Sequence, residues 1–417
     1  MRFSMVLMIL VFVALPCAAQ PQDTLRMPDL VREALSANPM IQAMNAGVQA
    51  ARAREGQVGL LDPPELTYMR EQMPHFNWSE PMMEKWELMQ MIPFPTKLPA
   101  ERSMASVKTA IEEQSRRQLQ VTLEMDVATT FAELWFAQEA SGIVEQSQKL
   151  LRDLLAIAET RYGAGNGGRG DVLRLTVEAL RLENELRDLR RQRATLRAML
   201  DALVNQKDHD RNAVAVLPDA PARLPSLDSL YHIAVRNRPS ILKDSLDVEM
   251  GRRELSLADN GYWPDLKVGV QYVHTPMPEL RGWSIIAGIS LPFAPWSIGK
   301  TQSAIEEAEA HVHEALASAD AAQSELRAEL VDLHGRVRVS QDEWTAFRER
   351  IVPQSLQAFD AQLVAYRSGR GMLVDVLESY KMLLEVQRDA AMTRARLEQD
   401  RARLRKAVGM AFSDGTM

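Results

Sequence analysis

The sequence predicts a mainly α fold, built from a duplicated half-molecule in which long helices are joined to short β-hairpins. Of the 417 residues 25% are charged and only 6% are aromatic, a balance typical of long helices. The chain also matches itself at a spacing near half its length, and two long stretches, 100–161 and 300–366, contain scarcely any Pro or Gly. Together these observations indicate an elongated, repeated helical protein.

The first residues predict export. Arg2, the apolar run Met5–Leu15 and the small residues around Ala18 form a secretory signal peptide, so residues 1–19 are expected to be removed. Lipidation of Cys17 is an alternative, but Pro16 at the cleavage position argues against it. A single Cys excludes a disulfide framework. No later stretch offers the roughly eighteen uncharged apolar residues of a membrane-spanning helix.

The duplication divides the mature chain into two repeats, residues 20–206 and 226–417. Leu30 aligns with Leu230 at a spacing of 200 residues, and Asp171 with Asp375 at a spacing of 204. Two copies of this length indicate a doubled half-molecule, because solenoids have periods of roughly 20 to 50 residues. A Pro-containing linker is expected at 207–225.

Each repeat has the same order of expected elements. A helix precedes a β-hairpin, whose strands alternate apolar and polar residues, as in Leu266, Val268 and Val270. A long helix with a narrow apolar stripe follows, then a tight turn and a returning helix, so the turn lies far from the hairpin. The expected ranges are helices 27–60 and 226–260, hairpins 64–95 and 264–294, long helices 100–161 and 300–366, turns 162–170 and 367–371, and returning helices 171–206 and 372–411.

Four strands per chain cannot close a membrane β-barrel, and an open sheet edge is not tolerated in a bilayer. Two copies would give eight strands and a filled interior, whereas three copies would give twelve strands and leave a passage. A pore therefore requires a homotrimer with a 12-stranded barrel in contact with membrane lipid. The net charge of −7 argues against a nucleic-acid partner.

Several motifs stand out, most of them present in both repeats. They are Ala37-Asn38-Pro39 and Asn237-Arg238-Pro239, the turns RYGAGNGGRGDVL (161–173) and AYRSGRGMLVDVL (365–377), and, in the second repeat, the Tyr262-Trp263-Pro264 that leads into a strand. Together they resemble the TolC-type outer membrane efflux proteins, the outer membrane factors. The resemblance implies a trimeric channel with an outer-membrane β-barrel and a periplasmic α-barrel of coiled-coil helices. It also implies a periplasmic membrane-fusion adaptor and an inner-membrane pump as partners, with no catalysis and no cofactor.

The short chain resembles the cation-efflux branch of this family, which favours export of copper, silver, cobalt or zinc with a pump of the RND type. Drug export and type I secretion are alternatives within the family. A periplasmic coiled-coil adaptor without a channel is an alternative from another class. An adaptor would not need two lipid-compatible hairpins flanked by tryptophans such as Trp86 and Trp283.

The resemblance places both turns at the periplasmic tip, where the adaptor docks and the channel closes. The implied adaptor-docking residues are Tyr162, Gly165, Tyr366, Gly369, Val376 and Leu377. The implied pore entrance is a ring of carboxylates from Asp375, Glu378 and Asp171, which would attract cations. Stabilisation of a helix start is the alternative role for Asp171 and Asp375. Gly371 stands where some relatives carry a gate-bonding arginine, for which Arg370 or Arg169 are possible substitutes.

Methionine is in excess near the hairpins. Thioethers and imidazoles suit soft cations such as Cu(I) and Ag(I), although Met is also a common apolar filler. The candidate metal ligands are Met69, Met73, His75, Met82, Met83, His274 and Met277.

Overall fold

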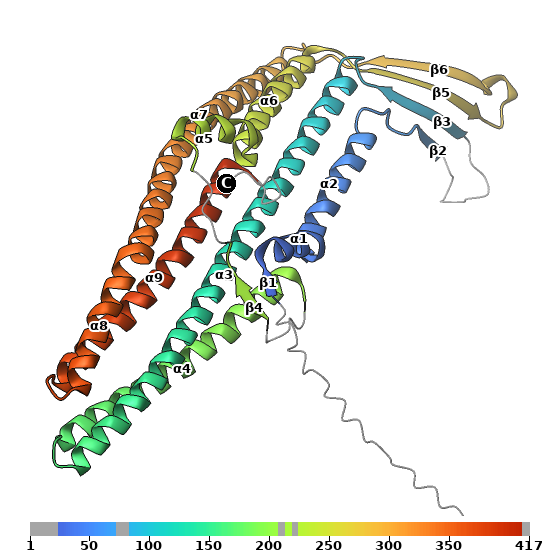
Figure 1. Cartoon of the computed structure of the whole chain (residues 1–417). Helices are drawn as coiled ribbons and strands as arrows, with labels where there is room; N and C mark the ends of the chain where they lie inside the picture. The colour runs from blue at the N-terminus through green and yellow to red at the C-terminus, as the bar shows by residue number, and fades with distance from the viewer. Residues whose placement is uncertain (1–23, 72–82, 207–212, 219–223, 411–417) are drawn as a thin grey trace, which may run out of the picture.

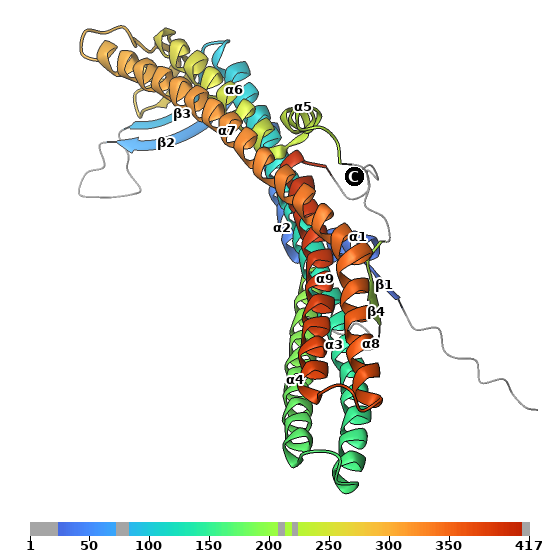
Figure 2. The same cartoon turned by 60° about the vertical axis from the view of Figure 1, so that its left-hand side comes forward.

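The computed structural model describes residues 24–71, 83–206, 213–218 and 224–410 (Figure 1). The expected signal peptide, residues 1–19 with Cys17, lies outside the described residues. The molecule is elongated, with a four-stranded sheet at one end and two helical turns at the opposite end (Figures 1 and 2). The longest helix, α3, has 67 residues and so spans roughly 100 Å.

Both repeats contain the expected order of helix, hairpin, long helix and returning helix. The first repeat comprises β1 (Thr24–Arg26), α1 (Met27–Ala37), α2 (Pro39–Gln57), β2 (Glu65–Glu71), β3 (Met83–Ile92), α3 (Lys97–Gly163) and α4 (Arg169–Val204). The second comprises α5 (Leu227–Asn237), α6 (Pro239–Asp259), β5 (Leu266–His274), β6 (Gly282–Ile289), α7 (Ile298–Ala346), α8 (Val352–Arg367) and α9 (Leu373–Val408).

Each repeat begins with two helices, so the expectation of a single first helix is wrong. The breaks fall at Asn38 and Arg238, which have extended ψ angles of 125° and 118°. Each precedes a proline, and the proline ring disfavours helical backbone at the residue before it. Asn38 also starts α2, because its side chain accepts a hydrogen bond from the Met40 amide at 2.8 Å.

The second long helix is interrupted as well. A π-turn at Phe347–Ile351 separates α7 from α8, where the sequence predicts one continuous helix. Pro353 follows this turn within the first two positions of α8. Because proline has no N–H and its ring clashes with the carbonyl four residues earlier, the regular α ladder cannot continue through it.

The two hairpins form one antiparallel sheet in the order β2-β3-β5-β6. Strands β3 and β5 pair directly from Glu84↔His274 to Ile92↔Leu266, so the sheet joins the two repeats. Within the described residues β2 and β6 are its edges. The duplication therefore produces a single four-stranded unit.

A second point of contact between repeats lies at mid-height. The expected linker contains strand β4 (Val214–Val216), which pairs in parallel with β1 through Leu25↔Ala215. Helix α1 packs there against α3 and α4, and we call this region the belt.

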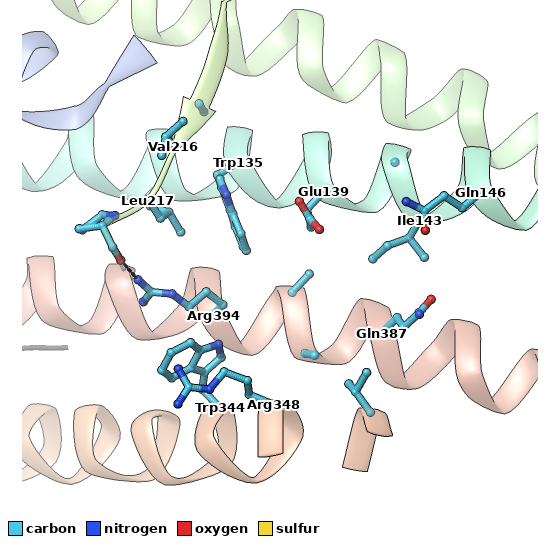
Figure 3. Close-up of a pocket in the computed structure, with 16 residues that line it drawn as sticks. Trp135, Glu139, Ile143, Gln146, Val216, Leu217, Trp344, Arg348, Gln387 and Arg394 are labelled. Carbon is cyan, nitrogen blue, oxygen red and sulfur yellow. Dashed lines mark hydrogen bonds between the residues drawn. The ribbon is translucent and has the colours of Figure 1, made fainter. Parts of the chain in front are cut away.

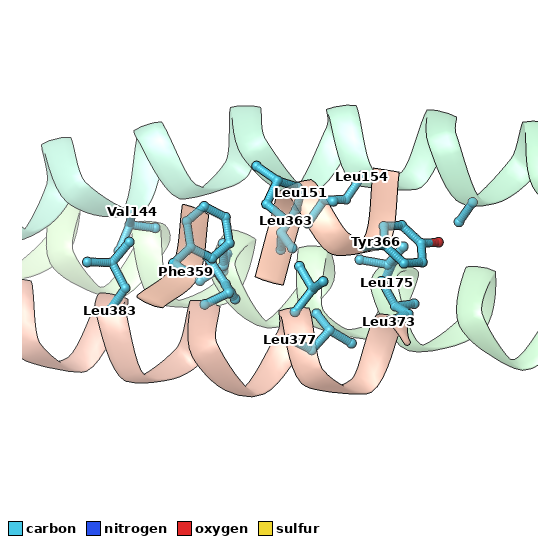
Figure 4. Packing of buried hydrophobic residues seen from close by; sticks show 14 of the residues in the cluster. Val144, Leu151, Leu154, Leu175, Phe359, Leu363, Tyr366, Leu373, Leu377 and Leu383 are labelled. Atoms are coloured by element: carbon cyan, nitrogen blue, oxygen red, sulfur yellow. The ribbon is translucent and has the colours of Figure 1, made fainter. Parts of the chain in front are cut away.

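Below the belt, the α3–α4 and α8–α9 hairpins share one narrow apolar core (Figure 4). Leucines at helical spacing fill it, and Leu151, Leu154 and Leu175 are at most 1% exposed. The aromatic rings of Phe359 and Tyr380 meet edge to face with centroids 6.5 Å apart. This core holds the two tip turns side by side.

Candidate functional sites

The two tip turns have the same backbone geometry. Gly165 and Gly369 adopt φ angles of +75° and +78°, a left-handed conformation that L side chains rarely adopt. The Gly369 amide donates to the Tyr366 carbonyl at 3.0 Å, as the Gly165 amide does to the Tyr162 carbonyl at 3.0 Å. A Cβ at Gly371 would lie 3.0 Å from the Tyr366 nitrogen, so an arginine at this position would crowd the turn.

A contact between the ends of α3 and α8 joins the two turns. Arg161 donates from Nη1 to the Tyr366 carbonyl at 3.0 Å, and its Cζ lies 4.7 Å from the centre of the Tyr366 ring. Burial raises the pKa of the Tyr366 hydroxyl above its ordinary value. Arg370 instead donates to Ser368 within its own turn. We call the Arg161–Tyr366 contact the tip clasp. The sequence suggested only Arg370 and Arg169 as arginines that could hold the tip closed.

The three candidate entrance carboxylates lie at the starts of the returning helices. Asp171 and Asp375 are the third residues of α4 and α9, and both are partly exposed. A carboxylate in a first turn stabilises a helix through its dipole by about 0.3–1 kcal/mol. Glu378 is exposed one turn farther along α9. The positions are compatible with both roles that the sequence suggests.

The six candidate docking residues divide into surface and core. Tyr162 is 50% exposed, whereas Tyr366, Val376 and Leu377 are buried among the tip helices. Other apolar side chains are exposed at the tip instead, namely Val364, Met372 and Leu173. A groove of about 490 Å³ between α4 and α9 is lined by Leu173, Val177, Val374 and Leu377, together with Arg174, Glu178, Arg181, Glu378 and Lys381.

The sheet has two unlike faces. One face carries aliphatic rows, and the clearest is Leu66, Leu88, Val270 and Ile285, which are paired in register across the four strands. The opposite face carries charged, amide, hydroxyl and glycine positions, including Lys85, Glu87, Lys267, Gln271 and Ser284. Ile285 is 87% exposed on its face. An exposed aliphatic face opposite a polar face is the pattern of a membrane β-barrel wall.

An aromatic row crosses all four strands on the aliphatic face. Tyr68, Trp86, Tyr272 and Trp283 are consecutive partners in the register. The ring centroids are 4.4 Å apart for Tyr68 and Trp86 and 5.0 Å apart for Tyr272 and Trp283. Tyr and Trp rings gather at membrane interfaces because one part of the ring is apolar and the other is polar. This row therefore marks one of the two boundaries between membrane and water.

A second aromatic pair marks the other end of the sheet. Trp263 and Phe94 stack with centroids 4.8 Å apart, next to the starts of β5 and α3. Trp263 precedes Tyr272 by nine residues, or about 30 Å along a strand. With a strand tilt of about 40° this gives a height near 23 Å, close to the apolar band of about 25 Å in outer-membrane barrels.

The junction between sheet and helices is held by Asp265. Its Oδ1 accepts from the Phe94 amide at 2.9 Å and from Lys97 Nζ at 2.8 Å, so it joins the two repeats. Burial alone would raise the pKa of Asp265, but the Lys97 ammonium and the Phe94 amide lower it overall. Thr96 donates to Asn260 at 2.6 Å beside this contact.

A groove of about 730 Å³ lies between α3, α9, the π-turn and the strand β4 segment (Figure 3). Arg394 is 6% exposed at its edge, donates to Glu398 at 2.6 Å and also bonds the Pro218 carbonyl. The guanidinium carbons of Arg394 and Arg348 lie 5.0 Å and 4.6 Å from the Trp344 ring centre. These contacts brace the π-turn against the belt.

The structure separates the candidate metal ligands. Met69 and Met83 share the polar face, since Met69 pairs with Lys85 and Met83 with Glu71. His274 pairs with Glu84 on the opposite face, and Met277 lies beyond the end of β5. The remaining candidates, Met73, His75 and Met82, lie outside the described residues. Within the part that the structure describes, His, Cys, Asp and Glu form no group of three or more that could hold a metal ion.

Comparison with known proteins agrees with this architecture. Residues 230–410 match the family model described as outer membrane efflux protein. The chain is 23% identical over 303 residues to the cobalt-zinc-cadmium resistance protein CzcC of Cupriavidus metallidurans, covering 70% of this chain and 69% of that protein. None of the described helices combines the length and apolarity needed to cross a membrane.

Solved structures share the fold over nearly the whole chain. The outer-membrane channel OprN matches with a TM-score of 0.79 and 18% identity, covering 92% of this chain and 90% of that one. VceC of Vibrio cholerae matches with a TM-score of 0.76 and 21% identity, covering 93% and 96%. CusC matches with a TM-score of 0.78 and 15% identity, covering 92% of each chain.

Members of the matched family are outer-membrane channels that extend into the periplasm and have no enzymatic activity. The family model covers the second repeat, and the first repeat completes the same fold. The second repeat is therefore similar to the outer membrane efflux proteins, and the chain as a whole shares the fold of the solved outer-membrane channels.

Proposed function

We propose that three copies of this chain form the outer-membrane channel of a tripartite efflux system that exports heavy-metal cations. The observation that carries the proposal is the single four-stranded sheet, with one aliphatic face and the unpaired edges β2 and β6 among the described strands. Open edges are unsatisfied in lipid, and pairing β2 of one copy with β6 of the next removes them. Three copies give twelve strands, enough to leave a passage.

Metal cations are the proposed substrates. The proposal that metal cations are exported is supported by the relative whose name describes resistance to cobalt, zinc and cadmium. We propose copper, silver, cobalt and zinc as the exported cations. A drug or type I secretion conduit of the same family is the alternative, because a passive channel takes much of its specificity from its pump. A periplasmic adaptor without a channel is disfavoured by the aliphatic sheet face and its aromatic row.

The tip is the proposed gate and adaptor-docking end. Asp171, Asp375 and Glu378 would form acidic rings in a trimer, where they would favour cations over anions. Exposed Tyr162 and Met372 offer the apolar contact for a periplasmic membrane-fusion adaptor, which would connect to an inner-membrane pump of the RND type. The tip clasp would hold the two helical hairpins together in the closed state.

Reconstitution of the full-length protein tests the channel. We expect outer-membrane extracts to contain a heat-modifiable trimer, and the purified trimer to conduct ions in planar bilayers. Asp375→Asn with Glu378→Gln should lower the ratio of cation to anion permeability, while Glu309→Gln, an exposed carboxylate of α7 far from the tip, serves as the control. A soluble monomer would overturn the proposal. Unchanged tolerance to copper, silver, cobalt and zinc in a deletion strain would overturn the substrate class.

A further inference from the structure

Charged residues on the aliphatic face of the sheet are confined to the end farther from the helices. Within the described strands this face carries only two charged side chains, Arg70 and Glu84, which are direct partners in the register. Both lie two residues beyond the aromatic row, since Arg70 follows Tyr68 and Glu84 precedes Trp86. The face therefore changes from apolar to charged at the aromatic row.

The second repeat continues this charged row. His274 pairs with Glu84 and lies two residues beyond Tyr272. Arg281 lies two residues before Trp283, and its backbone is extended, with φ −86° and ψ 133°, so its side chain is on the same face as Trp283. This outer row consists of Arg70, Glu84, His274 and Arg281. It sets one carboxylate against two guanidinium groups and an imidazole.

The two arginines of the outer row differ in how their charge is compensated. Arg70 donates to Glu84 Oε1 from Nε at 2.9 Å and from Nη2 at 2.7 Å. Arg281 is exposed, and its Nε donates to the Thr275 carbonyl at 2.7 Å. Glu279 belongs to the same loop, but no ion pair joins it or any other described carboxylate to Arg281. Arg281 is thus an uncompensated cation that a backbone contact holds in place.

We propose that Arg281 binds the phosphate of a lipid headgroup at the outer surface of the membrane. In the proposed channel the aliphatic face contacts lipid and the helices extend into the periplasm, so the outer row lies where the headgroups of the outer leaflet begin. A guanidinium is a planar fork that can bond two phosphate oxygens at once. Since Nε is engaged by the Thr275 carbonyl, the two Nη atoms of Arg281 remain for the phosphate.

The groups around Arg281 favour an anionic lipid. His274 and Arg281 occupy the next positions outward in the β5–β6 register, and an imidazole N–H can donate to a further phosphate oxygen. The carboxylate of Glu84 is neutralised by Arg70, so it does not repel an anion strongly. Trp283, on the side toward the helices, is 76% exposed and offers its ring to the acyl chains. The headgroup and the chains of a phosphorylated lipid would each meet a matching surface.

The test is binding of a phosphorylated glycolipid by the purified full-length channel. Native mass spectrometry in detergent would titrate the unmodified protein, Arg281→Gln and Lys267→Gln with bisphosphorylated lipid A. Lys267 is the matched control, because it is an exposed cation of the same sheet on the polar face. The apparent affinity should fall at least about tenfold in Arg281→Gln, which loses a charge-assisted bond to phosphate, and stay unchanged in Lys267→Gln.

Two further ligands test the phosphate and its source. The unmodified protein should bind dephosphorylated lipid A as weakly as Arg281→Gln binds the phosphorylated form, and excess inorganic phosphate should not displace the lipid. Equal affinity for the two lipids, or equal loss in both variants, would overturn the proposal. Displacement by inorganic phosphate would indicate a site for the free anion and overturn the assignment to lipid.

This inference rests on the proposed barrel, and conductance distinguishes its failure from failure of the channel. Arg281→Gln should form heat-modifiable trimers and conduct in planar bilayers like the unmodified protein, because Arg281 is on the face away from the lumen. Undiminished lipid binding by a conducting Arg281→Gln channel would overturn the lipid site and leave the channel standing. An unmodified protein that does not conduct would overturn the barrel on which the site depends.

Discussion

A charge on the aliphatic face of the sheet should prevent stable insertion, whereas the same charge one residue later should not. Ile285 and Ile286 are neighbours in β6 with the same side chain and opposite directions. Ile285 shares the aliphatic row with Val270, and Ile286 pairs with Gly269 on the polar face. Ile285→Lys and Ile286→Lys therefore differ mainly in whether the ammonium faces lipid or the lumen.

The depth of Ile285 sets the size of the effect. It lies two residues from Trp283 in the aromatic row, or roughly 5 Å inside the interface of a tilted strand. Lysine costs about 2–4 kcal/mol at the midplane and about 0–1 near the interface, so we expect about 2 kcal/mol per chain here. That corresponds to about a 30-fold shift in the folding equilibrium of each chain.

The assay is urea unfolding of the trimer in lipid vesicles, followed on gels by heat modifiability. Ile285→Lys should lower the unfolding midpoint and the yield of trimer in outer membranes, while Ile286→Lys should match the native protein. Equal loss in both variants would refute the assignment of the two faces. A larger loss for Ile286→Lys would reverse it.

Three further predictions concern the helices and the junction. Asp265→Asn should destabilise the protein near neutral pH. Because folding lowers the pKa of Asp265, the stability that its carboxylate contributes is complete above the pKa of the unfolded chain and is lost as pH falls through the folded pKa. Unfolding midpoints of variant and native protein that stay apart in acid would contradict this. Arg161→Ala should weaken the tip clasp and raise the resting conductance in planar bilayers, and Arg152→Ala on the same helix is the exposed control; equal currents would exclude a gating role for the clasp. Leu151→Ala should cost about 2–5 kcal/mol in denaturant unfolding, since Leu151 is 1% exposed in the tip core, and a change under about 1 kcal/mol would show that the core is loosely packed.

Much of the architecture follows from local sequence signals. The order of helix, hairpin, long helix and turn is correct in both repeats, because apolar spacing and the glycine-containing turns depend on residues close together in the chain. Prolines set the helix breaks in both repeats. Pro39 and Pro239 divide the first helices, and Pro353 produces the π-turn, which a prediction of single long helices missed.

The candidate sites likewise divide into those that local sequence indicates and those that depend on contacts between distant segments. Asp171 and Asp375 lie at helix starts, as the position after a turn indicates. The tip clasp was missed, because Arg161 and Tyr366 are 205 residues apart and nothing in either turn indicates the partner. The candidate metal ligands came from both hairpins, and the strand register places Met69 and His274 on opposite faces of the sheet.

By itself, the sequence indicated the duplication, through matches at a spacing near 200 residues, and the elements of each half, through local composition and periodicity. Only the tertiary structure decided how the halves join. The pairing of β3 with β5 sets one register, and that register joins the Tyr68–Trp86 pair to the Tyr272–Trp283 pair in a single aromatic row. The physical reason is that shifting a strand by one residue moves every side chain to the other face, and contacts between strands distant in the chain set that register.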